Sequence, residues 1–158
     1  KLTFSTNVNW SSNKNKDFYF TFDGVLTNFG NTNLSYSPNI IFNNSIDFKV
    51  SEGLNFSFRS NYIGQQYMGN LSSEASRLAP FFVNDLVANY SFSIDSISDD
   101  VNLSLMLNNI FDKKYSSHGY YYTYDDNQSN PGKVSTIEGA GYYPQAGINF
   151  VAGLSLKF

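Results

Sequence analysis

The stretch LNFSFRSNY at residues 54–62 alternates apolar and polar side chains. Leu54 and Phe56 fall on one side of this alternation, whereas Asn55 and Ser57 fall on the other. A period of two predicts a β-strand with one apolar and one polar face, because successive side chains of a strand point to opposite sides. The same pattern recurs at residues 2–10, 40–50, 82–94, 101–108 and 148–158. The chain is therefore expected to be all-β, with about six strands.

The connections between these segments alternate between short and long. The short connections lie around residues 51–53 and 95–100, and the long ones at residues 11–39, 65–80 and 112–146. Short turns at one end and long loops at the other are typical of antiparallel transmembrane β-barrels, whose strands need about 9–11 residues to cross the hydrocarbon. We expect the lipid-facing residues to be odd-numbered in the segment 101–108 and even-numbered in the other five segments. The side chains of Val101, Leu103, Leu105 and Leu107 should therefore be exposed.

Composition narrows the function classes. The chain has 158 residues, a net charge of −3, 18% aromatic residues and only 15% charged residues, where about 25% is usual. Such an aromatic chain does not resemble a disordered one, and its pI of 4.9 gives no basic surface for nucleic acid. The absence of cysteine excludes disulfides, and the apolar runs are too short for a spanning helix.

Two other arrangements remain open. A soluble, adhesin-like β-sandwich with a phenylalanine-rich core would also alternate, although its outer faces would need more charge than this chain carries. Aromatic residues near the segment ends, such as Trp10, Tyr62 and Tyr90, favour the barrel, because such rings sit at membrane interfaces. A barrel segment held as a client or accessory subunit of an outer-membrane assembly complex is the other alternative.

Residues 107–115, LNNIFDKKY, carry a recognisable pattern. It resembles the signature near the end of TonB-dependent outer-membrane receptors at Asn108, Asn109, Phe111, Asp112 and Tyr115. Residues 142–150, YYPQAGINF, are similar to the element before the last strand of these receptors at Tyr143, Pro144 and Gly147, although Ile148 stands where many members carry arginine. Residues 60–67 and 82–86 resemble further strand-end elements of the family.

This resemblance implies an antiparallel barrel of 22 strands with a plug domain and a TonB box, of which residues 1–158 would be the C-terminal part, without plug or TonB box. It implies a receptor in the cell outer membrane that imports a siderophore, haem or cobalamin. Its partners would be the lipid bilayer, the rest of the barrel and plug or another barrel chain, the TonB complex through the missing N-terminal part, and BAM-type assembly machinery. The long loops would be extracellular, and the short turns and C-terminus periplasmic.

Few residues suggest chemistry. Tyr120, Tyr121, Tyr122 and Tyr124 are candidates for stacking on a ligand, although alternate tyrosines would equally form part of an outer aromatic girdle. His118 is the only histidine and its loop carries scattered carboxylates, so we expect neither a metal site nor a cofactor. No catalytic constellation stands out, and we expect no enzymatic activity.

The C-terminal residues suggest an assembly signal, and three charged residues indicate which side of the strands faces away from lipid. Gly153, Leu156 and Phe158 resemble the C-terminal β-signal of outer-membrane barrels, while Val151 departs from it because a polar residue is usual there. Asp85, Arg59 and Lys157 fall on the polar side of the alternation. A charge facing lipid costs about 2–4 kcal/mol at mid-depth, so these three are expected to face a lumen or plug.

Overall fold

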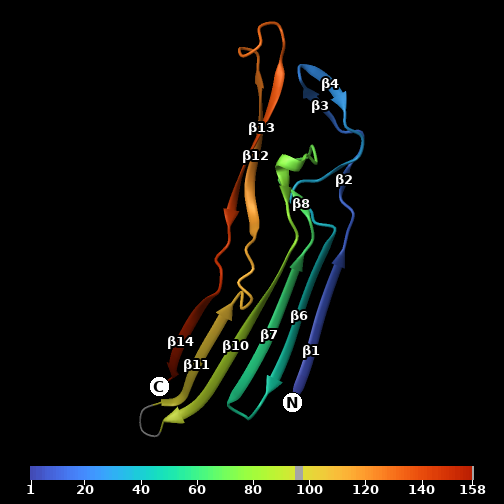
Figure 1. Cartoon of the computed structure of the whole chain (residues 1–158). Helices are drawn as coiled ribbons and strands as arrows, with labels where there is room; N and C mark the ends of the chain where they lie inside the picture. The colour runs from blue at the N-terminus through green and yellow to red at the C-terminus, as the bar shows by residue number, and fades with distance from the viewer. Residues whose placement is uncertain (95–97, 158) are drawn as a thin grey trace.

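Six long strands pair edge to edge into one antiparallel sheet, in the order β1-β6-β7-β10-β11-β14 (Figure 1). The computed structural model describes residues 1–94 and 98–157. The strands are β1 (Leu2–Trp10), β6 (Ile40–Lys49), β7 (Leu54–Ile63), β10 (Phe81–Ile94), β11 (Ser98–Asn108) and β14 (Asn149–Lys157). Within the described ranges the only helix is a single 3-10 turn, η1 (Glu74–Ser76), and no helix there has the length and apolarity to span a membrane. The predicted antiparallel all-β fold is confirmed.

The strand register puts most apolar residues of the six strands on one face, whereas Val83, Val87, Met106 and Val151 lie on the other. One row across the sheet runs through Leu2, Phe48, Phe56, Ala88, Leu105 and Ala152. Phe4, on the same face, is 63% exposed. Within the described residues, the remaining strands form only two-stranded sheets and none joins into a second layer over this face. We call this the outward face, and its alternation matches the predicted one.

The exposure predicted for β11 is only partly correct. Leu103 and Leu105 are each 42% exposed, and Leu107 is half-buried, but Val101 is only 2% exposed. The register places Val101 directly between Phe92 and Leu156. A small branched side chain flanked by two larger apolar ones loses its exposure without any second sheet above it, which is why the alternation alone gave the wrong answer here.

One polar row interrupts the outward face. Thr6, Asn44, Ser60 and Asn84 lie opposite one another on β1, β6, β7 and β10. Ser60 and Asn84 are buried among the larger side chains around them, and the amide oxygen of Asn44 is buried without a hydrogen-bond partner. Asn44 is thus the main departure from the alternation of residues 40–50.

The long connections are more ordered than predicted, because they contain four small hairpin-like pairs. These pairs are β2 (Lys14–Asn15) with β5 (Thr32–Asn33), β3 (Tyr19–Phe22) with β4 (Val25–Asn28), β8 (Gln66–Tyr67) with β9 (Arg77–Leu78), and β12 (Ser116–Asp126) with β13 (Ser135–Pro144). The turn between β3 and β4 is Asp23-Gly24, with φ of 53° and 75°. Two positive φ values in a two-residue turn match the twist of a β-hairpin.

The start of β1 and the end of β14 lie at the same end of the sheet as the turn between β6 and β7 (Figure 1). The Lys1 amino group donates to the Lys49 carbonyl oxygen at 2.9 Å, and the Lys49 N–H donates to the Lys1 carbonyl at 2.8 Å. Phe158 lies outside the described residues. The edges of β1 and β14 have no neighbouring strand within the described part of the chain, so the sheet is open there.

Candidate functional site

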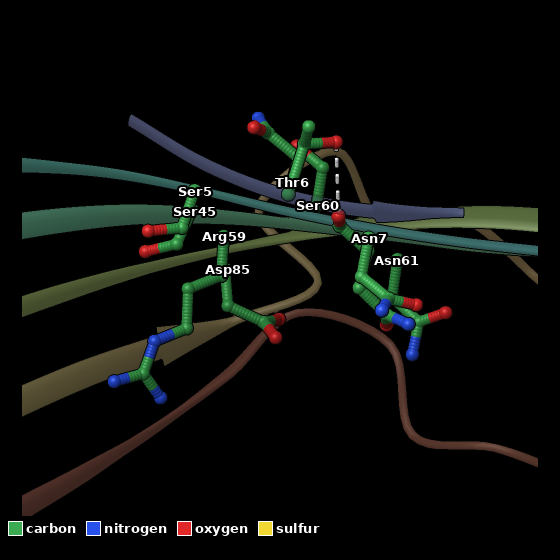
Figure 2. Close-up of a pocket in the computed structure, with 10 residues that line it drawn as sticks. Ser5, Thr6, Asn7, Ser45, Arg59, Ser60, Asn61 and Asp85 are labelled. Carbon is green, nitrogen blue, oxygen red and sulfur yellow. Dashed lines mark hydrogen bonds between the residues drawn. The ribbon is translucent and has the colours of Figure 1, made fainter. Parts of the chain in front are cut away.

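The polar side chains gather on the face opposite the outward face. One row across the sheet is Ser5, Ser45, Arg59 and Asp85, and the row beside it contains Asn7, Asn43 and Asn61. Figure 2 shows Arg59, Asp85 and Asn61 pointing to the side toward which the C-terminal part of the chain curls, while Thr6 and Ser60 point the other way. We call this polar face the concave wall. These seven residues, together with Thr6, Asn44 and Ser60 of the polar row, line a hollow.

Arg59 and Asp85 face each other across β7 and β10 without forming an ion pair. The Asp85 carboxylate instead accepts a hydrogen bond from the Asn109 backbone N–H at 2.8 Å. The Arg59 guanidinium extends in a different direction and remains exposed (Figure 2). Both charges lie on the concave wall, as the alternation predicted, and the guanidinium stays available to whatever occupies the hollow.

A second hollow adjoins the first at Asn61 and Asp85 and reaches the end of β11. Its lining includes Asn108, Asn149 and Tyr115. The Asn108 amide donates to the Asn149 side-chain oxygen at 2.9 Å. The buried side-chain oxygen of Asn61 has no partner.

Asn109 ties the end of β11 to the chain that leads into β14. Its side chain donates to the carbonyl oxygens of Lys113 at 2.9 Å and Ala146 at 3.2 Å, and it accepts the Lys113 N–H at 2.9 Å. Asn109 is only 4% exposed and has a left-handed φ of 49°, a conformation that asparagine tolerates better than most residues. We call Asn109 and Asp112, with the residues they bind, the clasp.

Asp112 forms the other half of the clasp. Its carboxylate accepts the Ile148 N–H at 3.0 Å and the Lys114 ammonium at 2.8 Å, and it has a left-handed φ of 49°. The Lys114 hydrogen bond, with that from Ile148, lowers the pKa of Asp112. A Cβ at Gly147 would collide with this carboxylate. The residues of the two sequence elements therefore meet in space.

The remaining residues of the resemblance take different positions. The Tyr115 ring packs on Phe81 with centroids 4.3 Å apart, and burial, followed by the Asp85 charge, raises the pKa of Tyr115. Phe111, Tyr143 and Pro144 are exposed and lie outside the clasp. The structure thus gives Asn109, Asp112 and Gly147 a structural role, which the sequence elements alone did not reveal.

The candidate ligand-binding tyrosines divide between two faces of the β12–β13 hairpin. Tyr120, Tyr122 and Tyr124 form a row of half-exposed rings, with centroids 6.3 and 6.4 Å apart and interplanar angles of 16° and 18°. Tyr120 and Tyr122 lie over Gly141 and Gly139 of β13, where a Cβ would overlap the rings. We call these three tyrosines the tyrosine ladder.

Tyr121 points to the other face of the hairpin. Its ring covers Gly69, and its hydroxyl donates to the Glu138 carboxylate. Burial, followed by the hydrogen bond to Glu138, raises the pKa of Tyr121 to about 12. Tyr121 therefore anchors the hairpin to the 65–80 connection and is not part of the ladder.

This anchor gives a pH-dependent prediction. The unfolded chain releases the tyrosine proton near pH 10, whereas the native state keeps it to a higher pH. Between these values the native state binds more protons, so the unfolding free energy falls as pH rises. We expect Tyr121→Phe to flatten this fall in denaturant titrations from about pH 9 to 12. Tyr120→Phe, on the exposed ladder, is the matched control, and equal slopes for Tyr121→Phe and the parent protein would contradict the assignment.

The three long connections are hydrogen-bonded to one another. The Asp23 N–H donates to the Thr136 hydroxyl, and the Thr136 N–H donates to the Asp23 carboxylate, both at 2.7 Å. The Tyr36 hydroxyl donates to the Gly119 carbonyl at 2.7 Å. The Tyr142 hydroxyl donates to a carbonyl of η1 at 3.0 Å. The connections 11–39, 65–80 and 112–146 thus form one cap over the end of the sheet.

His118, Gly153 and Leu156 are the remaining residues that the sequence singled out. His118 stacks on Tyr36 with centroids 4.7 Å apart, and the described residues contain no group of three or more potential metal ligands. In β14, a Cβ at Gly153 would lie 2.6 Å from the Ser104 hydroxyl, while Leu156 is exposed on the outward face. The expected β-signal is described only up to Lys157.

Comparison with known proteins gives one likeness. No family model matches the chain, and no curated protein matches it. The crystal structure of the ferric citrate transporter FecA in the unliganded form is similar over 77% of this chain and 18% of that chain, with 18% sequence identity and a TM-score of 0.46. The chain spans less than a fifth of that transporter. The likeness adds no functional argument to the geometry.

Proposed function

We propose that this chain is one part of the wall of an outer-membrane transport receptor. The observation that carries the proposal is the outward face, where phenylalanine, leucine and valine side chains of six strands lie uncovered beside a polar concave wall. Burying one such side chain contributes about 1.5–3 kcal/mol, so a whole face of them is unfavourable in water and favourable in lipid. The concave wall then faces a lumen.

The finer parts of the proposal follow the resemblance at the clasp residues. The receptor is energised by the TonB complex through a part of the polypeptide outside this chain, and it imports a nutrient such as a siderophore, haem or cobalamin. The open edges of β1 and β14 pair with the rest of the barrel, because unpaired backbone groups in lipid cost several kcal/mol each. The cap is extracellular and the short turns are periplasmic.

The open β14 edge also supports a second candidate, in which BAM-type machinery holds the segment as a client or accessory subunit by pairing with that edge. Separation of the two candidates requires the complete polypeptide. Outer membranes from cells that express it are extracted and the particle is analysed by mass spectrometry. A plug domain in the same polypeptide supports the receptor, whereas stable co-purification with assembly machinery and no plug supports the client.

Transport itself is tested by uptake in intact cells. Cells that carry the complete receptor should accumulate its nutrient, and collapse of the proton-motive force should stop the accumulation without removing the receptor from the outer-membrane fraction. Recovery of the protein in the soluble fraction without detergent would contradict the proposal, because the outward face would then require a different cover.

Topology gives a further prediction. Lys133 lies exposed at the tip of the β12–β13 hairpin, and Lys49 lies at the short turn beside Glu52. Trypsin added to intact cells should cut after Lys133, whereas cleavage after Lys49 should require a permeabilised outer membrane. Fragment masses distinguish the two sites. Cleavage at Lys49 alone in intact cells would mean the opposite orientation.

A further inference from the structure

We infer that two copies of the complete receptor meet in the membrane at the polar row, which consists of Thr6, Asn44, Ser60 and Asn84. This inference rests on the proposed function, because it requires the outward face to lie in lipid, and it names a partner for that face. Three features of the row carry it: its isolation on an apolar face, its depth, and its unused hydrogen-bonding groups.

Polar residues on the outward face are confined to this row. The register aligns the outward positions of the six strands, and apart from the row each aligned position in the described strands holds an apolar or aromatic residue. These positions are alternate residues of the ranges 2–10, 40–48, 54–62, 82–92, 101–107 and 150–156. The four exceptions lie opposite one another on neighbouring strands, so they form one continuous polar strip on a face that carries no charge.

The row crosses the middle of β1 and β6. Thr6 is the fifth of the nine residues of β1, and Asn44 is the fifth of the ten residues of β6. In strands that span the hydrocarbon, these positions lie near its centre, where lipid chains offer no hydrogen-bonding group. The row also borders the hollow of the concave wall, but Figure 2 shows the Thr6 and Ser60 side chains pointing away from Arg59 and Asp85.

The row has hydrogen-bonding capacity that the chain itself leaves unused. Within the described residues, the Thr6 hydroxyl makes one long hydrogen bond, to the Asn43 carbonyl oxygen at 3.4 Å. The Asn44 side chain is half-buried and its oxygen has no partner. Rotation about the last bond of an asparagine side chain exchanges the oxygen and the NH2 group, and this torsion is soft. The Asn44 amide can therefore either donate to or accept from a group that faces it.

A second copy supplies the groups that the row lacks. Copies inserted with the same orientation carry the row at the same depth, so a twofold axis along the membrane normal sets Thr6 and Asn44 of one copy against those of the other. Hydroxyls and amides both donate and accept, which makes the row complementary to itself. Side chains of this kind also join helices within membranes. Phe4 and Val8, which flank Thr6 and are 63% and 59% exposed, would pack around these hydrogen bonds and exclude lipid.

Energy transfer between labelled copies tests the inference. The complete receptor, labelled separately with donor and acceptor fluorophores, is reconstituted in phosphatidylcholine vesicles over a range of protein-to-lipid ratios. We expect transfer that saturates as a dimer. Asn44→Leu and Thr6→Val, which both suit a lipid-facing strand, should each raise the dissociation constant of the dimer at least about fivefold. Asn43→Leu, the neighbouring substitution on the concave wall, is the matched control and should leave it unchanged.

The outcomes separate this inference from the proposed function. Inserted receptor that shows no energy transfer above that of random mixing would overturn the dimer and leave a monomeric transport receptor. Equal dissociation constants for Asn44→Leu, Thr6→Val and Asn43→Leu would show that the copies meet elsewhere. A different membrane protein that co-purifies with the parent receptor but not with Asn44→Leu would assign the row to that partner and overturn the second copy. Failure of the parent receptor to insert would instead remove the proposed function.

Discussion

Phe4→Arg is expected to lower the free energy of unfolding of the assembled receptor by about 2–4 kcal/mol, the cost of an arginine on the lipid side of a barrel near mid-depth. Phe4 lies near the middle of β1, on the outward face, and most of its side chain is exposed. The new guanidinium would have to be hydrated within the hydrocarbon or pull the strand toward the interface. Unfolding in urea from lipid vesicles measures the loss, and heat-modifiable gel mobility shows whether the barrel assembles.

Ser5→Arg is the matched control for this substitution. Ser5 is the next residue of β1, is also exposed, and points to the concave wall (Figure 2). If the concave wall faces a lumen, as proposed, the same charge placed there meets water, and stability should change little. Equal losses for Phe4→Arg and Ser5→Arg would show that the outward face does not contact lipid, and would remove the main support for the proposed function.

Asn109→Ala is expected to cost about 3 kcal/mol through the clasp. The substitution deletes three hydrogen bonds of a buried side chain, each worth about 1 kcal/mol, and it places alanine in a left-handed conformation that costs about 1–2 kcal/mol. Partial entry of water to the freed carbonyls of Lys113 and Ala146 offsets some of this sum. The same urea unfolding assay measures the effect.

Two further variants separate the contributions to the destabilisation by Asn109→Ala. Asn109→Gly removes the same hydrogen bonds but accepts the positive φ, so it should be less destabilising than Asn109→Ala. Asn108→Ala removes one exposed hydrogen bond to Asn149 and should cost about 1 kcal/mol or less. If Asn108→Ala were as destabilising as Asn109→Ala, the clasp would not be the element that joins β11 to β14.

The sheet was predictable because a period of two residues determines both faces of a strand at once. A shift of one residue in any of the six strands would have exchanged the faces, so segments such as 54–62 specify their own orientation. This reasoning does not predict the burial of Val101. Its burial depends on the sizes of Phe92 and Leu156, which lie on other strands and are opposed to it only in the folded register.

Of two hairpins in the cap, β3–β4 has a recognisable sequence pattern and β12–β13 does not. Asp23-Gly24 between two short apolar stretches is a recognised hairpin pattern, and attention to that pair would have found β3 and β4. The β12–β13 hairpin has no such signal, because consecutive tyrosines and alternating glycines obscure the period. Its regularity comes from rings that cover glycines across the pair, which is a tertiary property.

The candidate site was predictable only in part. The resemblance singled out Asn109, Asp112 and Gly147, but their meeting depends on hydrogen bonds between segments about 35 residues apart, which no local pattern encodes. The polar wall followed from alternation, whereas the failure of Arg59 and Asp85 to pair did not. The Asp85 carboxylate accepts the Asn109 N–H instead, and the Arg59 guanidinium points away from it (Figure 2).

The reciprocal bonds between Asp23 and Thr136 have a consequence for how this molecule can be re-engineered or can diverge. Each residue satisfies a backbone N–H of the other, although they are 113 positions apart in the chain. A transplant of residues 11–39 alone into another scaffold would leave both groups without their partner. To keep both hydrogen bonds, the two outer connections would have to be moved together.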